Sequence, residues 1–380
     1  MQPGQIVELR SKLGCETVTR AIGASCYRHG ARFVDVSYFD PHIRLARIQH
    51  ADPDTLDFVP SWHRERVLLY GEQRCARIIP SGATPPGLSE GLDPERAAKE
   101  RWPMIAEYHK LIDDNTTNWC GVPGPSLDWA GIVYPELDAA DAEAALWTDV
   151  FHICRVDEPD PIAAWRKRLD ALARAETKLN EHRFDSLHFQ GPGTDLTIGL
   201  LPTSRWLSGI SETVDGIPFM ANLPTEEVFT APDPQRAEGV VRSTKPLQLR
   251  GGTLLEDLVV RFEGGRAVEI EAARGAEVLR QMCASDEGAS RLGEVALVDR
   301  EGRVGALDRV FYTTLLDENA ASHIALGSAY LVTVGEEDRE RANESSIHVD
   351  FMLGGDDVEV TGITRGGERV PVLRGGNWQF

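Results

Sequence analysis

The chain has 380 residues, of which 42% are hydrophobic and 26% charged, and its formal net charge is −20. At about 150 residues per domain, this length predicts two or three domains. The acidity disfavours nucleic acid or an anionic membrane surface as the main partner. No apolar run approaches the roughly 18 residues that cross a membrane, and the first residues lack the pattern of a signal peptide. We therefore expect a cytoplasmic, globular protein.

The first half of the chain has the pattern of predicted helices and strands that is typical of an α/β domain. Apolar residues at helical spacing predict helices over 15–29, 94–112 and 138–154, and residues 33–38 have a strand pattern. A loop is expected at 81–87, where Gly and Pro are frequent. Asp160 and Pro161 open a long amphipathic helix toward His182, because proline fits the first helical turn.

The second half is rich in β segments. Residues 186–189 and 196–200 are predicted strands, joined by a tight turn at 190–195. Further strand patterns occur at 258–262, 267–271, 294–298 and 346–351. We therefore predict an α/β N-terminal domain over residues 1–185 and a β-rich α+β C-terminal catalytic domain over residues 186–380.

Six cysteines are scattered along the chain, and none forms a C-x-x-C pair. This spacing gives no support to a cysteine zinc site or a thioredoxin-type motif. The simplest interpretation is that the thiols are reduced and buried.

His348 and Asp350 form the first candidate site. On a strand, their spacing of two places both side chains on one face, while Ile347, Val349 and Phe351 alternate onto the other. A histidine and an aspartate side by side can bind a metal ion or form a structural ion pair, and the spacing alone does not separate these alternatives.

The second candidate is the segment from Asp317 to Tyr330. Asp317 or Asn319 could cap a short helix, and His323 and Tyr330 would then share a helical face. Glu318 could point to the same centre as His323 from the start of that helix. The alternative is a capped helix with a hydrogen-bonded structural histidine.

Two further pieces contain glutamates beside apolar residues. Glu226 and Glu227 lie in an apolar segment bracketed by prolines, and Glu294 heads an apolar strand. Buried carboxylates require a cation or a hydrogen-bond network. Carboxylates mixed with a few histidines suit Zn²⁺, Co²⁺, Mn²⁺ or Mg²⁺, and a bridged pair of such ions would be ~3.5–4 Å apart.

The sequence resembles the thermophilic metalloaminopeptidases of the aminopeptidase T and aminopeptidase S family. The most specific matches are N-L-P-T-E-E-V-F-T at residues 222–230 and D-E-N-A-A-S-H at residues 317–323. Further matches are at 35–40, 155–161, 191–197, 293–298 and 348–350, so the resemblance covers most of the chain.

The resemblance implies a ligand set and two further active-site groups. One of Glu226 and Glu227 would bind metal, and because neighbouring strand residues face opposite ways, we favour Glu227 as the ligand and Glu226 as the catalytic base. Glu318 would be an additional ligand or an acid/base group, and Tyr330 an active-site hydroxyl. The remaining implied metal ligands are Glu294, His323, His348 and Asp350.

The expected activity is removal of N-terminal residues from short peptides by water that two divalent metal ions activate. A glutamate would take the proton of that water and return it to the leaving amine. Tyr330 would donate a hydrogen bond to the tetrahedral oxyanion. The resemblance also implies a homodimer that encloses its active sites.

Two other functions remain open from the sequence. His323, His348 and Asp350 alone would form the 2-His-1-carboxylate set of a mononuclear non-haem Fe(II) ring-opening dioxygenase. The glutamates at 226, 227 and 294 argue against this, because one iron needs no second set of carboxylates. The other alternative is a binding protein without activity, which the presence of every candidate ligand disfavours.

Overall fold

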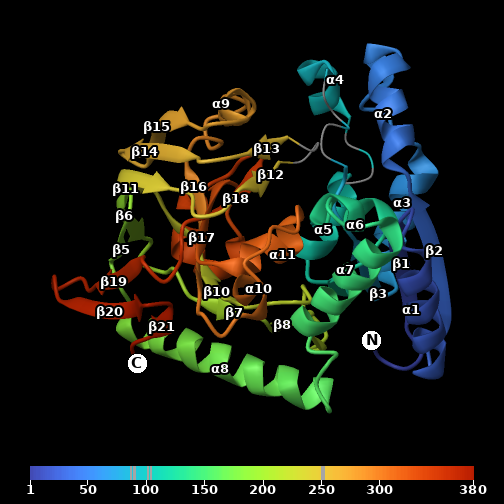
Figure 1. Ribbon diagram of the computed structural model, residues 1–380, viewed down its shortest axis with the longest axis horizontal. Coiled ribbons are helices and arrows are strands. Elements are labelled where there is room, and N and C mark those ends of the chain that lie inside the picture. The colour runs from blue at the N-terminus through green and yellow to red at the C-terminus, as the bar shows by residue number, and fades with distance from the viewer. Residues whose placement is uncertain (86–87, 89–90, 101, 103–104, 250–252) are drawn as a thin grey trace. The chain divides into compact units, whose positions relative to one another are not determined.

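A computed structural model describes residues 1–85, 88, 91–100, 102, 105–249 and 253–380 (Figure 1). The chain divides into two compact units. The first consists of Met1–Val150 and Ile210–Leu223, and the second of Phe151–Gly209 and Pro224–Phe380.

The first unit is built on a four-stranded parallel sheet with the order β2-β1-β3-β4. Helices separate the strands along the chain. Parallel pairing requires such connections, because the chain must return to the end of the sheet at which the previous strand began. The strands are β1 (Ile6–Lys12), β2 (Phe33–Phe39), β3 (Ala76–Ser81) and β4 (Asn118–Pro123), with a separate hairpin of β8 (Ser211–Glu212) and β9 (Pro218–Phe219). The α-helices are α1 (Glu16–Arg28), α2 (Pro41–His50), α3 (Ser61–Glu72), α4 (Pro94–Lys99), α5 (Ala106–Asp113), α6 (Leu127–Val133) and most of α7 (Ala139–Ile153), whose last residues belong to the second unit.

The second unit contains two larger antiparallel sheets. The eight-stranded sheet has the order β15-β14-β11-β6-β5-β19-β20-β21, and the five-stranded sheet has the order β18-β17-β16-β10-β7. The first comprises β5 (Ser186–Gly191), β6 (Thr194–Leu200), β11 (Pro232–Arg242), β14 (Val259–Glu263), β15 (Arg266–Glu271), β19 (Glu359–Ile363), β20 (Arg369–Arg374) and β21 (Asn377–Trp378). The second comprises β7 (Leu207–Ser208), β10 (Glu227–Thr230), β16 (Leu292–Val298), β17 (His323–Gly327) and β18 (His348–Met352). A small hairpin pairs β12 (Leu247–Gln248) with β13 (Leu254–Leu255), and the helices are α8 (Pro161–His182), α9 (Ala276–Cys283), α10 (Arg303–Ala306) and α11 (Thr314–Asp317).

One hydrophobic core joins the two sheets of this unit to helix α8. Leu172 and Leu179 of α8 are fully buried in it, with Ile198 of the larger sheet and Val295 and Ile324 of the smaller one. The five-stranded sheet therefore has one face committed to the core, and its other face is available for polar residues.

The division into units differs from the domain boundary that we expected near residue 185. Helix α8 belongs to the second unit, because its apolar side chains pack into the core of that unit. The segment Ile210–Leu223 belongs to the first unit, where Gly121 of β4 donates a backbone hydrogen bond to the carbonyl oxygen of Ala221 and accepts one from the N–H of Leu223.

Most predicted elements are present with small shifts in their ends. The predicted helices at 15–29, 138–154 and 161–182 correspond to α1, α7 and α8, and the predicted strands correspond to β2, β5, β6, β14, β15, β16 and β18. The helix predicted over 94–112 is two helices, α4 and α5, and part of its middle lies outside the described residues. The loop predicted at 81–87 follows β3, and residues 86 and 87 also lie outside them.

The segment after Asp317 was predicted wrongly. Asp317 ends α11, and its carboxylate does not cap the short 3-10 helix that follows but accepts hydrogen bonds from the backbone N–H groups of Phe311 and Thr313. His323 begins strand β17, so His323 and Tyr330 do not share a helical face. The pairing of neighbouring strands determines the secondary structure of this segment, so the helical spacing of its residues was not informative.

The six cysteines form no disulfide within the described chain, and Cys15, Cys26, Cys75 and Cys154 are buried. Within the described residues, no helix combines the length and the apolar character that a membrane crossing demands.

Candidate metal centre

The candidate ligands lie on one face of the five-stranded sheet. In an antiparallel sheet, residues paired directly across strands point to the same face. Glu294 of β16 pairs with Ala325 of β17, which in turn pairs with Asp350 of β18. His348 lies two residues before Asp350 and therefore points the same way.

The same register extends to β10. His323 pairs with Ala296, and Ala296 pairs with Phe229. Glu227 lies two residues before Phe229, so its side chain shares this face. The intervening residues point into the core, where Val228, Val295, Ile324, Val349 and Phe351 are buried. The alternation predicted for residues 347–351 is therefore confirmed.

A β-bulge at Gly293 decides the direction of Glu294. Leu292 pairs with Leu326 on the core face, and the register shifts before Glu294 pairs with Ala325. In a regular strand without the bulge, Glu294 would point into the core like Leu292, because residues two apart share a face. A Cβ at position 293 would lie 2.2 Å from the carbonyl oxygen of Gly327, so only glycine fits there.

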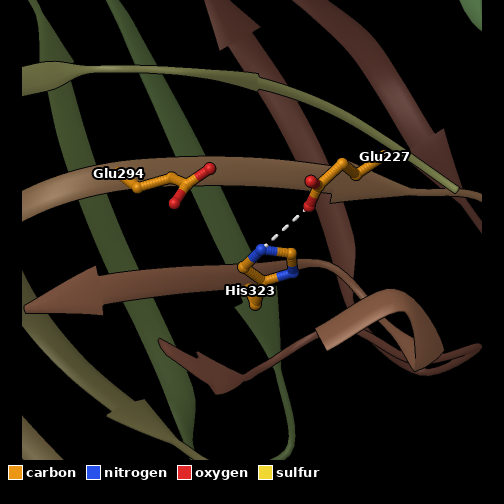
Figure 2. A group of neighbouring side chains, drawn as sticks. All are labelled: Glu227, Glu294 and His323. Atoms are coloured by element: carbon orange, nitrogen blue, oxygen red, sulfur yellow. Dashed lines mark ion pairs between the residues drawn. The ribbon is translucent and has the colours of Figure 1, made fainter. Parts of the chain in front are cut away.

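Two groups of potential ligand atoms meet on this face. Glu227, Glu294 and His323 form one group, with ligand atoms within 4.8 Å of one another, and Figure 2 shows these side chains converging from three strands. Glu294, His348 and Asp350 form the other group within the same limit. Glu294 belongs to both groups, so its carboxylate is placed to serve two neighbouring centres.

Short contacts connect the members of each group. Glu227 Oε2 lies 3.0 Å from His323 Nε2. His348 Nε2 lies 3.1 Å from Glu294 Oε2 and 3.1 Å from Asp350 Oδ1. A single Nε2 proton cannot satisfy both carboxylates in full, and a cation at this point would.

Both histidines present the same nitrogen to the carboxylates. His323 Nδ1 lies 3.2 Å from the carbonyl oxygen of Ala321, and His348 Nδ1 lies 2.8 Å from that of Ser328. A carbonyl can only accept, so we assign the Nδ1 proton of each ring to this bond. In the neutral ring this leaves the Nε2 lone pair free for a metal ion, and such an Nδ1 hydrogen bond is the usual support of a metal-binding histidine.

Charges within the cluster perturb one another strongly. Burial raises the pKa of Glu294, and its hydrogen bond with His348 offsets this only in part. Burial alone would lower the pKa of His323, but the adjacent Glu227 carboxylate outweighs it and raises that pKa to about 10. The pKa of His348 is also raised well above its usual range, because Asp350 and Glu294 outweigh burial. In the absence of a cation, bound protons on these side chains must offset the negative charges of the carboxylates.

The donor set fits divalent metal ions. Glu227 Oε2 is buried, and no donor in the described part of the chain is aligned to give it a hydrogen bond. Glu294 and Asp350 are 4% and 7% exposed, so their charge is costly to bury without a cation. Oxygen and imidazole ligands in this proportion suit borderline and hard divalent ions.

Glu318 and Tyr330 border the cluster. Glu318 begins a short 3-10 helix, Glu318–Ala320, and burial together with the Asp350 and Glu227 charges raises its pKa well above the usual range. The Tyr330 ring lies 5.1 Å from that of His348 and 5.8 Å from that of Phe229, between ring centroids, and the residue is 46% exposed.

Glu226 does not join the cluster, which corrects our expectation that it is the catalytic base. Its Oε1 accepts a hydrogen bond of 2.6 Å from Arg155, and its Oε2 accepts one of 2.5 Å from Arg168. The residue is completely buried. A completely buried carboxylate with both oxygens hydrogen-bonded to guanidinium groups is turned away from the cluster, so we no longer assign it the role of base.

Sequence reasoning missed Arg155 and Arg168. A signal for Arg168 was present, because the buried residues of α8 are Trp165, Arg168, Leu172, Ala175 and Leu179, at helical spacing. An arginine on the apolar stripe of a helix needs a buried acidic partner. The identity of that partner depends on the tertiary fold.

Comparisons with known proteins agree with this geometry. Residues 1–378 match the model of the family described as thermophilic metalloprotease (M29). The chain is 42% identical to an aminopeptidase T of Thermus aquaticus and 36% identical to the aminopeptidase AmpS of Bacillus subtilis. These alignments cover 100% of this chain, and 94% and 95% of the two relatives. The structure matches that of wild-type AmpT from Thermus thermophilus with a TM-score of 0.92 at 40% identity, covering 100% of this chain and 95% of the other.

The chain therefore belongs to the M29 family of thermophilic metalloproteases. It is an aminopeptidase, a hydrolase that acts on peptide bonds, and membership of this family implies a divalent metal. The resemblance seen in the sequence is confirmed. The ring-opening dioxygenase finds no support among these relatives, which are all named aminopeptidases.

Proposed function

We propose that this aminopeptidase uses two divalent metal ions, held by the cluster on the five-stranded sheet, to remove N-terminal residues from short peptides. The observation that carries the proposal is the shared position of Glu294 in both ligand groups. The ligands of one ion would be Glu227, Glu294 and His323, and those of the other Glu294, His348 and Asp350.

The charge of the cluster supports two ions. Four carboxylates surround the site, from Glu227, Glu294, Glu318 and Asp350, and the two histidines bind as neutral rings. Two divalent cations balance four negative charges, whereas one would leave a net negative charge in a largely buried place. The mixed oxygen and nitrogen set leaves Zn²⁺, Co²⁺, Mn²⁺ and Mg²⁺ as the candidate ions.

The ions, when bound, would supply Lewis acidity that activates a water molecule and polarises the scissile carbonyl. The protein groups around them have complementary roles. Glu226 lies outside the cluster, so Glu318 is the carboxylate there without an assigned role. It would be an additional ligand or the group that passes a proton to the leaving amine. The Tyr330 hydroxyl would donate a hydrogen bond to the oxyanion.

A free carboxylate or a metal ion at the site would hold the free α-amine of the peptide. This interaction makes the enzyme an exopeptidase, because a peptide bond within a longer chain has no charged amine to offer. The proposed substrates are short peptides, which the enclosed homodimer implied by the family resemblance would admit, with neither nucleic acid nor membrane as a partner.

The proposal includes a homodimer and a cytoplasmic location. The dimer follows from the family resemblance, and light scattering on the purified protein tests it, since a fully active monomer would contradict it. The location is supported by six cysteines without a disulfide among them, which suits a reducing compartment.

Metal counting together with peptide turnover tests the central proposal. The metal-free chain is titrated with Co²⁺ or Zn²⁺, and bound metal and cleavage of a short peptide with a free amino terminus are measured on the same sample. We expect activity to follow occupancy up to two ions per chain. Full activity with one ion, or with none, would overturn the two-metal proposal.

A further inference from the structure

A buried polar network lies beside the metal centre and takes no part in the chemistry described above. Arg168 donates from Nε to Glu226 Oε2 at 2.5 Å and from Nη1 to Asp299 Oδ2 at 3.0 Å. Arg155 donates to the other oxygen of Glu226. Asp299 Oδ2 also accepts a hydrogen bond of 2.6 Å from the indole N–H of Trp378. Two positive and two negative side chains thus form a closed, neutral set.

This network is expensive to bury. Arg155 and Arg168 are each 5% exposed, Asp299 is 7% exposed, and Glu226 is fully buried. The free energy lost when four charges leave water exceeds the free energy gained from their mutual attraction, unless the geometry of the ion pairs is excellent. Apolar residues of similar volume often give the same stability. Stability alone is therefore a weak reason for such a set, which points to a role in fixing geometry.

The network holds the backbone next to three candidate metal-site carboxylates. Arg168 Nη2 donates to the carbonyl oxygen of Glu226 at 3.1 Å, which fixes the peptide that leads into Glu227. The N–H of Glu226 donates to Asn319 Oδ1 at 2.7 Å, and Asn319 directly follows Glu318. Asp299 directly follows β16, the strand that carries Glu294.

These contacts join segments that are far apart in the sequence. The start of β10, the 3-10 helix with Glu318 and the end of β16 each have one anchor in the network, and helix α8 supplies the central guanidinium. A shift of any segment would move its carboxylate relative to the others. Metal affinity is sensitive to such shifts, because ligands must converge within a few tenths of an ångström.

We propose that Glu226, clamped by Arg155 and Arg168, is a positioning residue that sets the spacing of the carboxylates Glu227, Glu294 and Glu318 at the metal site. The inference rests on the proposed two-metal function. It gives a role in assembling the site to a glutamate that neither binds metal nor touches substrate.

Co²⁺ binding to the full-length, metal-free chain tests the inference, with thermal unfolding measured on the same samples. Glu226→Gln keeps the side-chain volume and removes the charge. We expect its Co²⁺ dissociation constant to rise by roughly 10- to 100-fold, with a changed visible absorption of the bound Co²⁺. This absorption depends directly on the geometry of the ligands around Co²⁺. A loss of stability alone would leave it unchanged.

Glu8→Gln is the matched control. Glu8 is 1% exposed, accepts a 2.7 Å hydrogen bond from Arg77 and one of 2.6 Å from Tyr108, and lies in the other unit. Its loss should lower the midpoint of thermal unfolding and leave Co²⁺ affinity and absorption unchanged. If Glu226→Gln behaves in the same way, the network is only structural and the inference is overturned.

A milder pair of variants covers the case in which Glu226→Gln does not fold. Arg155→Gln leaves Glu226 with its bonds to Arg168, and Arg155→Lys restores the charge. We expect weaker Co²⁺ binding for Arg155→Gln and recovery for Arg155→Lys. Wild-type affinity in both would overturn the inference and leave the metal centre intact, whereas failure of the wild-type chain to bind two Co²⁺ ions would overturn the proposed function itself.

Discussion

His348 Nε2 lies 3.1 Å from Glu294 Oε2, although the two residues are 54 positions apart and strand β17 lies between their strands. Strands two apart in a sheet are separated by about 9.6 Å. The side chains can meet only because β17 presents Ala325 and Gly327 between them. Small residues on the middle strand are thus part of the metal centre.

Replacing Ala325 with leucine should therefore close the space for metal. Ala325 is fully buried and lies between Glu294 and Asp350 on the ligand face. We expect loss of metal binding and of activity, with overpacking that costs about 1–3 kcal/mol of stability. Ile324→Phe overpacks the core face of the same strand and should lose stability while keeping its metal. Bound metal is measured by elemental analysis, and full occupancy in Ala325→Leu would contradict this account of the face.

His348→Ala should lose metal and activity while the fold is largely retained. Strand β18 is held by its pairing with β17 and by Val349 and Phe351 in the core, none of which depends on the imidazole. A purely structural His348–Asp350 pair would instead cost roughly 3–5 kcal/mol when broken and leave metal content unchanged.

Metal stoichiometry and the midpoint of thermal unfolding, measured on one preparation, separate these outcomes. His188→Ala is the matched control, because His188 Nε2 contacts Asp195 Oδ1 at 2.8 Å on β5 and β6, within the same unit. Full metal occupancy of His348→Ala with a large drop in midpoint would reject the assignment of His348 as a ligand.

Glu318→Gln distinguishes the two roles left for Glu318. If Glu318 passes a proton, the variant should bind two metal ions and lose about 10²–10⁴-fold in kcat. If Glu318 is a ligand, the variant should bind one ion fewer. Metal analysis and peptide turnover on the same sample decide between them. A variant with wild-type metal content and wild-type kcat would remove Glu318 from the site altogether.

Tyr330→Phe should keep both metal ions, because the ring contacts with Phe229 and His348 do not involve the hydroxyl. We expect kcat to fall by about 10²–10³-fold with little change in KM, since an oxyanion donor acts mainly in the transition state. Steady-state kinetics over a range of peptide concentrations provides the measurement. A rise in KM alone would instead assign the hydroxyl to substrate binding.

Metal uptake should release protons and strengthen as the pH rises. In the metal-free protein, the neighbouring carboxylates raise the pKa of His323 to about 10, so its Nε2 carries a proton at neutral pH that the metal must displace. Below that pKa, each displaced proton makes the apparent association constant rise about tenfold per pH unit. Calorimetric titrations in buffers of different ionisation enthalpy count the protons. Uptake that is independent of pH from about 6 to 9 would contradict the raised pKa.

The sequence by itself determined the elements with strong local patterns. Helix α8 begins and ends where the Asp160-Pro161 start and the apolar spacing place it, and its N-cap hydrogen bond from Ala163 N–H to Asp160 confirms the start. The alternation of residues 347–351 determined that His348 and Asp350 share a face. The sequence motifs and the family resemblance also named the five residues that the structure brings together in two groups, although they did not separate Glu227 from Glu226.

Tertiary structure alone decided the direction of Glu294, the different surroundings of Glu226 and Glu227, and the strand at His323. The first depends on the bulge at Gly293, which exists only in the pairing of β16 with β17. Glu226 is fixed by Arg168 of α8, 58 positions away, and by Arg155 between α7 and α8, 71 positions away. These are contacts between distant segments, and their register is set when the strands and helix α8 pack together, so no local spacing along the chain encodes it.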